Sequence, residues 1–178
     1  MKKHFLISVL ILYTCITKLF AQTTRYDTCN KLQQYVGEWR YTNGADTIRI
    51  YLRYHKYFAE VITVNYLDGL WGWHEYKTGN TVIQSNYQNR FVTLPSNATD
   101  SFLQINSIAL SMPDCSDTSH RLIGLIKDSN HPTSTYRIVA TLDSTKTVMT
   151  WWQTFSRGSF HNPDTDMTLP QEFILYKQ

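Results

Sequence analysis

The alternation of apolar and charged residues along the segment 46–54 constrains the fold of this chain more than any other feature. Side chains of a β-strand point alternately to its two faces, so a period of two predicts a strand with one buried and one solvated face. One face carries Ile48, Ile50 and Leu52, and the other carries Arg49 and Arg53. Since burying an unpaired charge is costly, we expect the aliphatic face to point inward.

Eight further segments have strand character, and turn residues lie between most of them. The nine predicted strands cover residues 36–42, 46–54, 72–76, 81–85, 102–108, 121–127, 135–142, 148–155 and 172–176. Asn43-Gly44 and Gly79-Asn80 mark two hairpin turns, because these residue types tolerate a positive φ. A single short helical piece is predicted at 27–35, capped by Asp27 or Thr28. The pattern predicts an all-β fold, an antiparallel meander that closes into a barrel, with a β-sandwich as the alternative.

Residues 1–21 have the parts of a secretory signal peptide. A basic start at Lys2-Lys3 is followed by a short apolar run, and the small residue Ala21 precedes the expected cut before Gln22. The run is too short for a permanent transmembrane helix, which takes about 20 residues. We therefore expect a secreted or periplasmic protein in which residues 22–178 form one β-barrel-like domain without a transmembrane segment.

A second processing site is possible within the same leader. Cys15 follows Leu12-Tyr13-Thr14, and this order resembles the lipid-bearing cysteine of bacterial lipoproteins. Processing there would leave the protein anchored to a membrane through Cys15.

The charge of the chain changes when the leader is removed. The full chain has 17 Lys and Arg against 14 Asp and Glu, but Lys2, Lys3 and Lys18 lie in the leader, so 14 of each sign remain. A neutral, mixed surface lacks the basic footprint that nucleic-acid binding needs, and no Lys/Arg run suits anionic lipid. We exclude nucleic acid as a partner and expect a monomer.

Two cysteines, Cys29 and Cys115, remain after the leader, and only one pairing is possible. In an oxidising compartment we expect them to form a disulfide. The alternative is two unrelated buried thiols.

The most specific local motif is Gly37-Glu38-Trp39 at the start of the first predicted strand. This Gly-x-Trp resembles the motif with which lipocalins begin, where the Trp packs across the floor of the barrel. The chain is also similar to a family of short secreted proteins of unknown function from Gram-negative bacteria, with a leader ending in Ala-Gln and then Gly-x-Trp-x-Tyr, here Gly37 to Tyr41. The second resemblance implies no activity. A lipocalin-like barrel implies a small apolar or amphipathic ligand in its mouth.

From these features we predict a candidate ligand site inside the barrel. Its candidate residues are Trp39, Ile48, Ile50, Leu52, Trp151 and Trp152. Trp151 and Trp152 are neighbours on one strand, so only one of them points inward, and the sequence leaves open which. Ordinary core filling is the competing explanation for the tryptophans.

Catalytic and metal-binding patterns are weak. His74 beside Glu75, His120, and His161 near Asp164 and Asp166 are the available acid, base and ligand candidates. None has metal-ligand spacing, and the nucleophile elbow and phosphate-binding loop motifs are absent from the sequence. We therefore expect no metal and no cofactor, and non-catalytic binding of a small ligand as the main function. The alternatives are an interaction protein with a sealed core and a hydrolase that uses a His/carboxylate pair.

Overall fold

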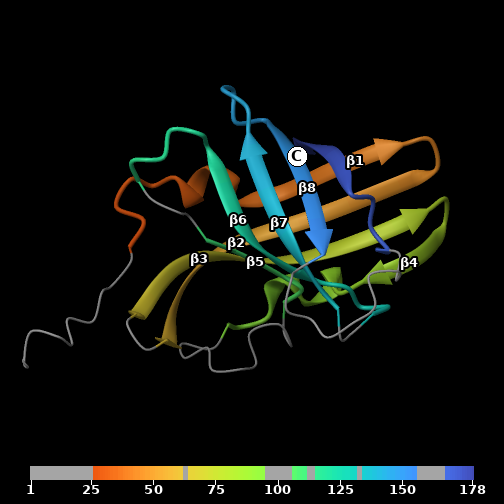
Figure 1. Ribbon diagram of the computed structural model, residues 1–178. Coiled ribbons are helices and arrows are strands. Elements are labelled where there is room, and N and C mark those ends of the chain that lie inside the picture. The colour runs from red at the N-terminus through yellow and green to blue at the C-terminus, as the bar shows by residue number, and fades with distance from the viewer. Residues whose placement is uncertain (1–25, 62–63, 95–105, 112–114, 132–133, 156–166) are drawn as a thin grey trace, which may run out of the picture.

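The computed structural model describes residues 26–61, 64–94, 106–111, 115–131, 134–155 and 167–178. Nine strands and two short 3-10 helices are described within these ranges (Figure 1). The elements are η2 (Leu32–Tyr35), β1 (Gly37–Asn43), β2 (Asp46–Val61), β3 (Val64–Thr78), β4 (Thr81–Ser85), η3 (Tyr87–Phe91), β5 (Ile108–Ser111), β6 (Arg121–Lys127), β7 (Thr135–Leu142), β8 (Val148–Phe155) and β9 (Glu172–Lys177).

Eight of the strands close into an antiparallel barrel. The order is β2-β1-β9-β8-β7-β6-β5-β3, and the pairing of β2 with β3 completes the circle. β4 lies outside the circle and pairs with β3. In Figure 1, β6, β7 and β8 cross in front of the long β2 and β3 strands. The predicted all-β fold and the barrel are confirmed, and the architecture is consistent with a lipocalin-like barrel.

The two predicted hairpins form as expected. β1 pairs with β2 from Gly37 opposite Leu52 to Asn43 opposite Asp46, and β3 pairs with β4. Gly44 has φ +57° and Gly79 has φ +58°, the left-handed conformation that these turns require and that other residues rarely adopt. The turn residues therefore account for both strand reversals.

Other boundaries differ from the prediction. β2 and β3 are much longer than 46–54 and 72–76, and they pair from Asp46 opposite Thr78 to Val61 opposite Val64, with an irregularity after Phe58. The strand expected at 102–108 is tested only in part, because residues 102–105 lie outside the described ranges; residues 106–107 are not in a strand, and β5 runs from Ile108 to Ser111. η3 forms between two predicted strands, where no helix was predicted.

The barrel interior is filled by one apolar cluster. Its largest members, fully buried, include Trp39, Trp151, Ile48, Ile50 and Leu52. Two glycines allow strands to approach inside this cluster. A Cβ on Gly124 would lie 1.9 Å from the carbonyl oxygen of Ala109, and one on Gly72 would lie 2.7 Å from Leu52 Cδ2. Close packing, not side-chain chemistry, explains why glycine occupies both positions.

Candidate functional site

One end of the barrel is sealed by η2. The helix predicted at 27–35 forms only over Leu32–Tyr35, and its N-cap position is Lys31 instead of Asp27 or Thr28. The Asp27 carboxylate still accepts hydrogen bonds from the backbone N–H groups of Lys31 (3.0 Å) and Leu32 (2.8 Å) at the start of the helix. The indole Nε1 of Trp39 donates to the carbonyl oxygen of Tyr35 (2.7 Å). Lys177 Nζ, 5.2 Å from the Trp39 ring centre, donates to the Gln34 carbonyl. The helix is therefore fixed to the first and last strands of the barrel.

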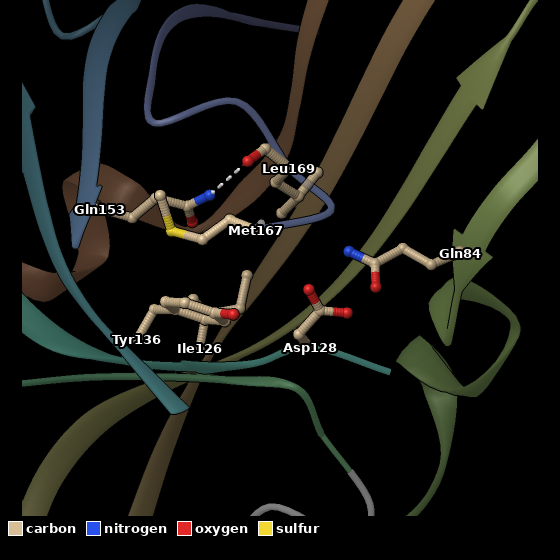
Figure 2. A pocket seen from close by; sticks show the side chains of 7 residues that line it. All are labelled: Gln84, Ile126, Asp128, Tyr136, Gln153, Met167 and Leu169. Atoms are coloured by element: carbon tan, nitrogen blue, oxygen red, sulfur yellow. Dashed lines mark hydrogen bonds between the residues drawn. The ribbon is translucent and has the colours of Figure 1, made fainter. Parts of the chain in front are cut away.

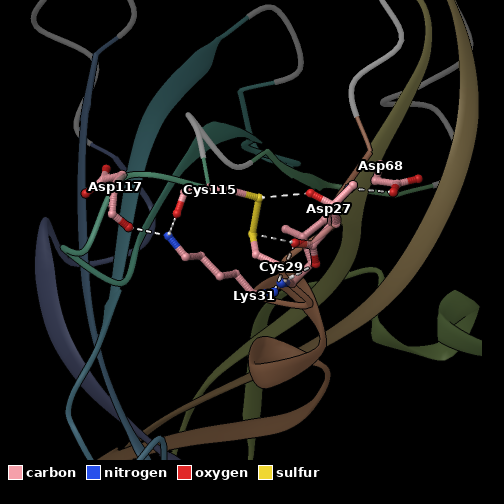
Figure 3. The surroundings of a disulfide bond; sticks show 8 residues. Asp27, Cys29, Lys31, Asp68, Cys115 and Asp117 are labelled. Carbon is pink, nitrogen blue, oxygen red and sulfur yellow. Dashed lines mark hydrogen bonds between the residues drawn. A yellow bond between two sulfur atoms is a disulfide. The ribbon is translucent and has the colours of Figure 1, made fainter.

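A disulfide between Cys29 and Cys115 holds the same end (Figure 3). Lys31 Nζ donates to the carbonyl oxygens of Cys115 (2.9 Å) and Asp117, which fixes the far side of the bridge to η2. The predicted pairing is confirmed. Asp27, Cys29 and Cys115 bring three potential metal-ligand atoms within 4.8 Å. Because both sulfurs are bonded to each other, neither is the thiolate that a metal would need.

Five of the six residues predicted to line a ligand site lie inside the barrel, and Trp152 does not. Trp39, Ile48, Ile50, Leu52 and Trp151 are all inside the barrel with no exposed surface. Trp152 is 37% exposed on the outer face. Trp151 stacks against Phe173, with ring centres 6.0 Å apart. The structure thus resolves the orientation of the two tryptophans, while ligand binding by these residues stays a prediction.

The opposite end of the barrel, here called the mouth, combines three buried polar side chains with apolar ones. Its cavity has a volume of about 10 Å³, and Figure 2 shows the side chains around it. The lining residues are Gln84, Ile126, Asp128, Tyr136, Gln153, Met167 and Leu169. This volume matches one water, since a site of about 10–15 Å³ by this measure holds one.

The mouth is closed by the segment before β9. Gln153 Nε2 donates to the carbonyl oxygens of Leu169 (3.2 Å) and Pro170 (2.9 Å). The Asp128 carboxylate accepts from the Thr168 backbone N–H (3.0 Å) and hydroxyl (3.1 Å). Two buried side chains of the barrel therefore hold this segment across the mouth.

His74 is the one ionisable interior side chain that the sequence had singled out as a candidate. It is fully buried, and its Nδ1 lies 2.6 Å from Ser107 Oγ. The Ser107 hydroxyl donates to Asn86 Oδ1 (3.1 Å), which can only accept. His74 Nδ1 therefore carries the proton and donates to Ser107, and Nε2 is left as an acceptor. Burial lowers the pKa of His74 to about 4, although Asp128 and Gln84 raise it in part.

This arrangement does not support acid–base or nucleophilic chemistry at His74. Its neighbour in sequence, Glu75, points to the outer face, where it pairs with Arg49. Ser107 is 3% exposed, and its hydroxyl proton is engaged with Asn86, so His74 Nδ1 is unable to act as its base. His120 lies in a loop at φ +46°. His161, Asp164 and Asp166 lie outside the described residues.

A larger depression lies on the outside of the barrel, across β1, β2 and β3. We call it the outer groove. It has a volume of about 320 Å³ and is lined by Glu38, Arg40, Thr47, Arg49, Glu75, Lys77 and Gly79. Arg49 joins Glu38 (Nε to Oε1, 3.1 Å) and Glu75 (3.3 Å), and Lys77 also pairs with Glu75 (3.1 Å). Arg49 thus points outward, as expected, and its ion pairs with Glu38 and Glu75 hold it there.

Beside the outer groove, η3 packs on the outer faces of β2 and β3. The guanidinium groups of Arg49 and Arg90 both contact the Tyr87 ring, at 4.2 Å and 4.3 Å from its centre. Arg53 donates to the carbonyl oxygens of Arg90 and Val92, both at 2.9 Å. Burial raises the pKa of Glu38, but the nearby Tyr87 hydroxyl and the hydrogen bond from Arg49 lower it more, so its carboxyl titrates below its usual range. The charged side chains of Arg49 and Glu38, which border the groove, are therefore held in place by contacts with η3.

Sequence reasoning missed both the mouth and the outer groove. Gln84, Asp128 and Gln153 are ordinary polar residues in the sequence, and only closure of the barrel shows that their side chains are buried. A signal was available for the groove. The alternation in 46–54 already placed Arg49 outside, and the hairpin turn at Asn43-Gly44 set Arg40 directly opposite it.

The fold and its sites define a closed, antiparallel β-barrel with a filled interior and a charged groove on its outer face. The chain belongs to a family of unknown function (DUF6705), whose model matches residues 1–178. No curated protein and no solved structure matches the chain. The described residues include no helix that is long and apolar enough to cross a membrane.

Proposed function

We propose that this protein is an exported, non-catalytic recognition protein that binds its partner through the outer surface of a filled barrel. One observation carries the proposal: the interior side chains form one packed cluster, and the cavity at the mouth admits about one water. A drug-sized ligand needs a pocket of roughly 300 Å³ or more. Of the two depressions described above, the outer groove has that size.

Export is part of the proposal. The disulfide supports it, because such bonds persist in oxidising compartments and are rare in the cytosol. Mass spectrometry of the mature protein should give Gln22 as the first residue. A lipid on Cys15 would instead make the protein membrane-anchored and refute the cut after Ala21.

The filled interior is tested by enlarging a buried side chain. Ala140 lies on β7 without exposed surface, opposite Trp151 on β8. In a filled barrel, Ala140→Leu should reduce the free energy of unfolding by about 1–3 kcal/mol, because the added atoms displace neighbours. Thr150→Leu, an exposed change on the same strand as Trp151, is the matched control and should be nearly neutral. Unfolding in urea, followed by tryptophan fluorescence, measures both.

A direct titration complements that test. An apolar fluorescent probe such as anilinonaphthalene sulfonate should give no saturable change in tryptophan emission of the wild-type protein or of Trp39→Phe. Stoichiometric binding that Trp39→Phe alters, together with a stability-neutral Ala140→Leu, would refute outer-surface recognition in favour of a ligand inside the barrel.

Ligand binding in the mouth is the second candidate function. It is favoured by the buried acceptor His74 Nε2, which has no direct hydrogen-bond partner among the described residues and whose ring is influenced by Asp128 and Gln84 of the mouth. Buried polar atoms of this kind are uncommon and call for water or a ligand. A ligand would reach the mouth only if the segment before β9 opened. Binding in the mouth should therefore be slow, and it should break the hydrogen bonds that Gln153 and Asp128 make with this segment.

A further inference from the structure

We propose that the outer groove binds the sugar-acid units of an acidic oligosaccharide, with Arg40 taking the carboxylate and Tyr176 stacking on the ring. This inference rests on the proposed function, since it names the ligand class that the outer surface recognises.

The first step of the argument is an unbalanced charge. Arg40 on β1 lies directly opposite Arg49 on β2, and like charges in such a cross-strand pair repel. Arg49 is neutralised by Glu38 and Glu75. Within the part of the chain that the structure describes, the Arg40 side chain has no ion pair or hydrogen bond, and it is exposed. The groove therefore presents one guanidinium group, that of Arg40, whose positive charge an incoming anion would neutralise.

The second step concerns the kind of anion. A guanidinium forms two parallel hydrogen bonds with a carboxylate or a phosphate. Two carboxylates, those of Glu38 and Glu75, border the same groove. They repel a dianionic phosphate more strongly than a singly charged carboxylate, because the repulsion scales with the charge. The groove thus favours a singly charged anion, and the proposal takes this anion to be a carboxylate.

The third step concerns the rest of the ligand. Glu75 Oε1 is used by both Arg49 and Lys77, and carboxylate oxygens accept further hydrogen bonds from hydroxyl groups. Tyr176 on β9 lies opposite Arg40 on the same outer face, and its side chain is 55% exposed. An exposed aromatic ring beside hydrogen-bonding side chains suits a ligand with an apolar face and a hydroxyl-bearing rim, which a sugar ring provides. The groove volume of about 320 Å³ has room for such a unit.

The charged groups around Arg40 also need little reorganisation, whereas the exposed Arg40 side chain is ordered by the ligand. The ion pairs of Arg49 and the packing of Tyr87 against it fix the floor of the groove before a ligand arrives. Preorganised polar groups lose less entropy on binding than mobile ones, so the groove retains more of its interaction energy.

Isothermal titration calorimetry of the mature protein with tetragalacturonate tests the inference. Maltotetraose is the neutral sugar control, and tetra-aspartate is the anionic control without sugar rings. We expect saturable binding of tetragalacturonate alone. Comparable binding of tetra-aspartate would overturn the proposal in favour of an acidic peptide, and absence of tetragalacturonate binding would overturn it outright.

Variants locate the site. Arg40→Gln should weaken tetragalacturonate binding by about 10- to 100-fold, the loss expected for a charge-assisted hydrogen-bonded pair. Arg137→Gln removes an exposed arginine from β7, away from the groove, and should leave the affinity unchanged. Tyr176→Ala should weaken binding, whereas Tyr176→Phe should retain it. Equal losses in Arg40→Gln and Arg137→Gln would show general charge attraction and sink the assignment.

Two readouts separate failure of this inference from failure of the proposed function. Arg40→Gln relieves the repulsion opposite Arg49, so its thermal midpoint should be unchanged or higher, and a lost affinity is then not a folding defect. If tetragalacturonate fails to bind while Ala140→Leu destabilises the protein as expected, the sugar-acid assignment is wrong and the filled barrel stands.

Discussion

Acid should destabilise this protein through His74. Burial lowers the pKa of His74 to about 4 in the folded state, against about 6.5 in an unfolded chain. Between these values the unfolded chain binds a proton at this site and the folded protein does not. Protonation therefore favours unfolding, and stability is lost as the pH falls from about 6.5 to about 4. At about 1.4 kcal/mol for each pH unit, the full effect is about 3 kcal/mol.

Urea unfolding at pH 6.5, 5.5 and 4.5 measures this loss, with the free energy of unfolding extrapolated to water at each pH. In His74→Gln, which keeps an N–H to donate to Ser107 but has no titrating ring, the decrease should be much smaller. Ile138→Val, another buried change in the barrel, should lower stability at every pH by about 1 kcal/mol and keep the wild-type slope. Identical pH slopes in the wild type and His74→Gln would refute the reasoning.

Three further outcomes are expected. Replacing Cys29 and Cys115 by serine should lower the unfolding free energy by about 4 to 5 kcal/mol, since the bridge spans 86 residues. Urea unfolding checks this: the variant should be less stable than the oxidised wild type, and the difference should disappear when the wild type is reduced. Gly124→Ala should cost at least about 3 kcal/mol or abolish folding, because its Cβ would meet backbone of the next strand, and circular dichroism of the expressed protein decides. Trp151→Ala should cost about 3–5 kcal/mol in urea unfolding, whereas Trp152→Ala should cost far less, and similar values for both would contradict their assigned faces.

Much of the barrel was predictable because its signals are local. The predicted strands at 81–85, 121–127, 135–142 and 148–155 match β4, β6, β7 and β8. Turn residues bound each of these segments, and their β-branched, aliphatic and aromatic residues favour strands. Strict alternation of buried positions is seen in 135–142. These signals depend on neighbours along the chain. The end of the fifth strand was predicted too early, at 108 instead of Ser111, because apolar residues continue through 102–110 and the pattern alone did not show which part pairs with β3.

The sites were harder to predict because they depend on contacts between distant segments. Alternation establishes that Trp151 and Trp152 face opposite ways, but the inward one is decided by partners such as Phe173 on another strand. Asp128 is buried only because the segment with Thr168 folds over it. Arg40 differs from other surface arginines only through its place opposite Arg49. None of these relations leaves a periodic trace in the sequence.

The pairing of β1 with β9 determines the order in which the barrel can be completed. The two strands are joined through Trp39 opposite Lys177 and Arg40 opposite Tyr176, about as far apart along the chain as its strands allow. Until β9 arrives, β1 and β8 are open edges with unpaired backbone groups, and such edges invite pairing with other chains. Such a non-local closure is slow, because its loop entropy is lost before the contacts form. A newly made chain therefore stays an unfinished sheet, vulnerable to aggregation and to chaperone capture, until β9 is free to pair.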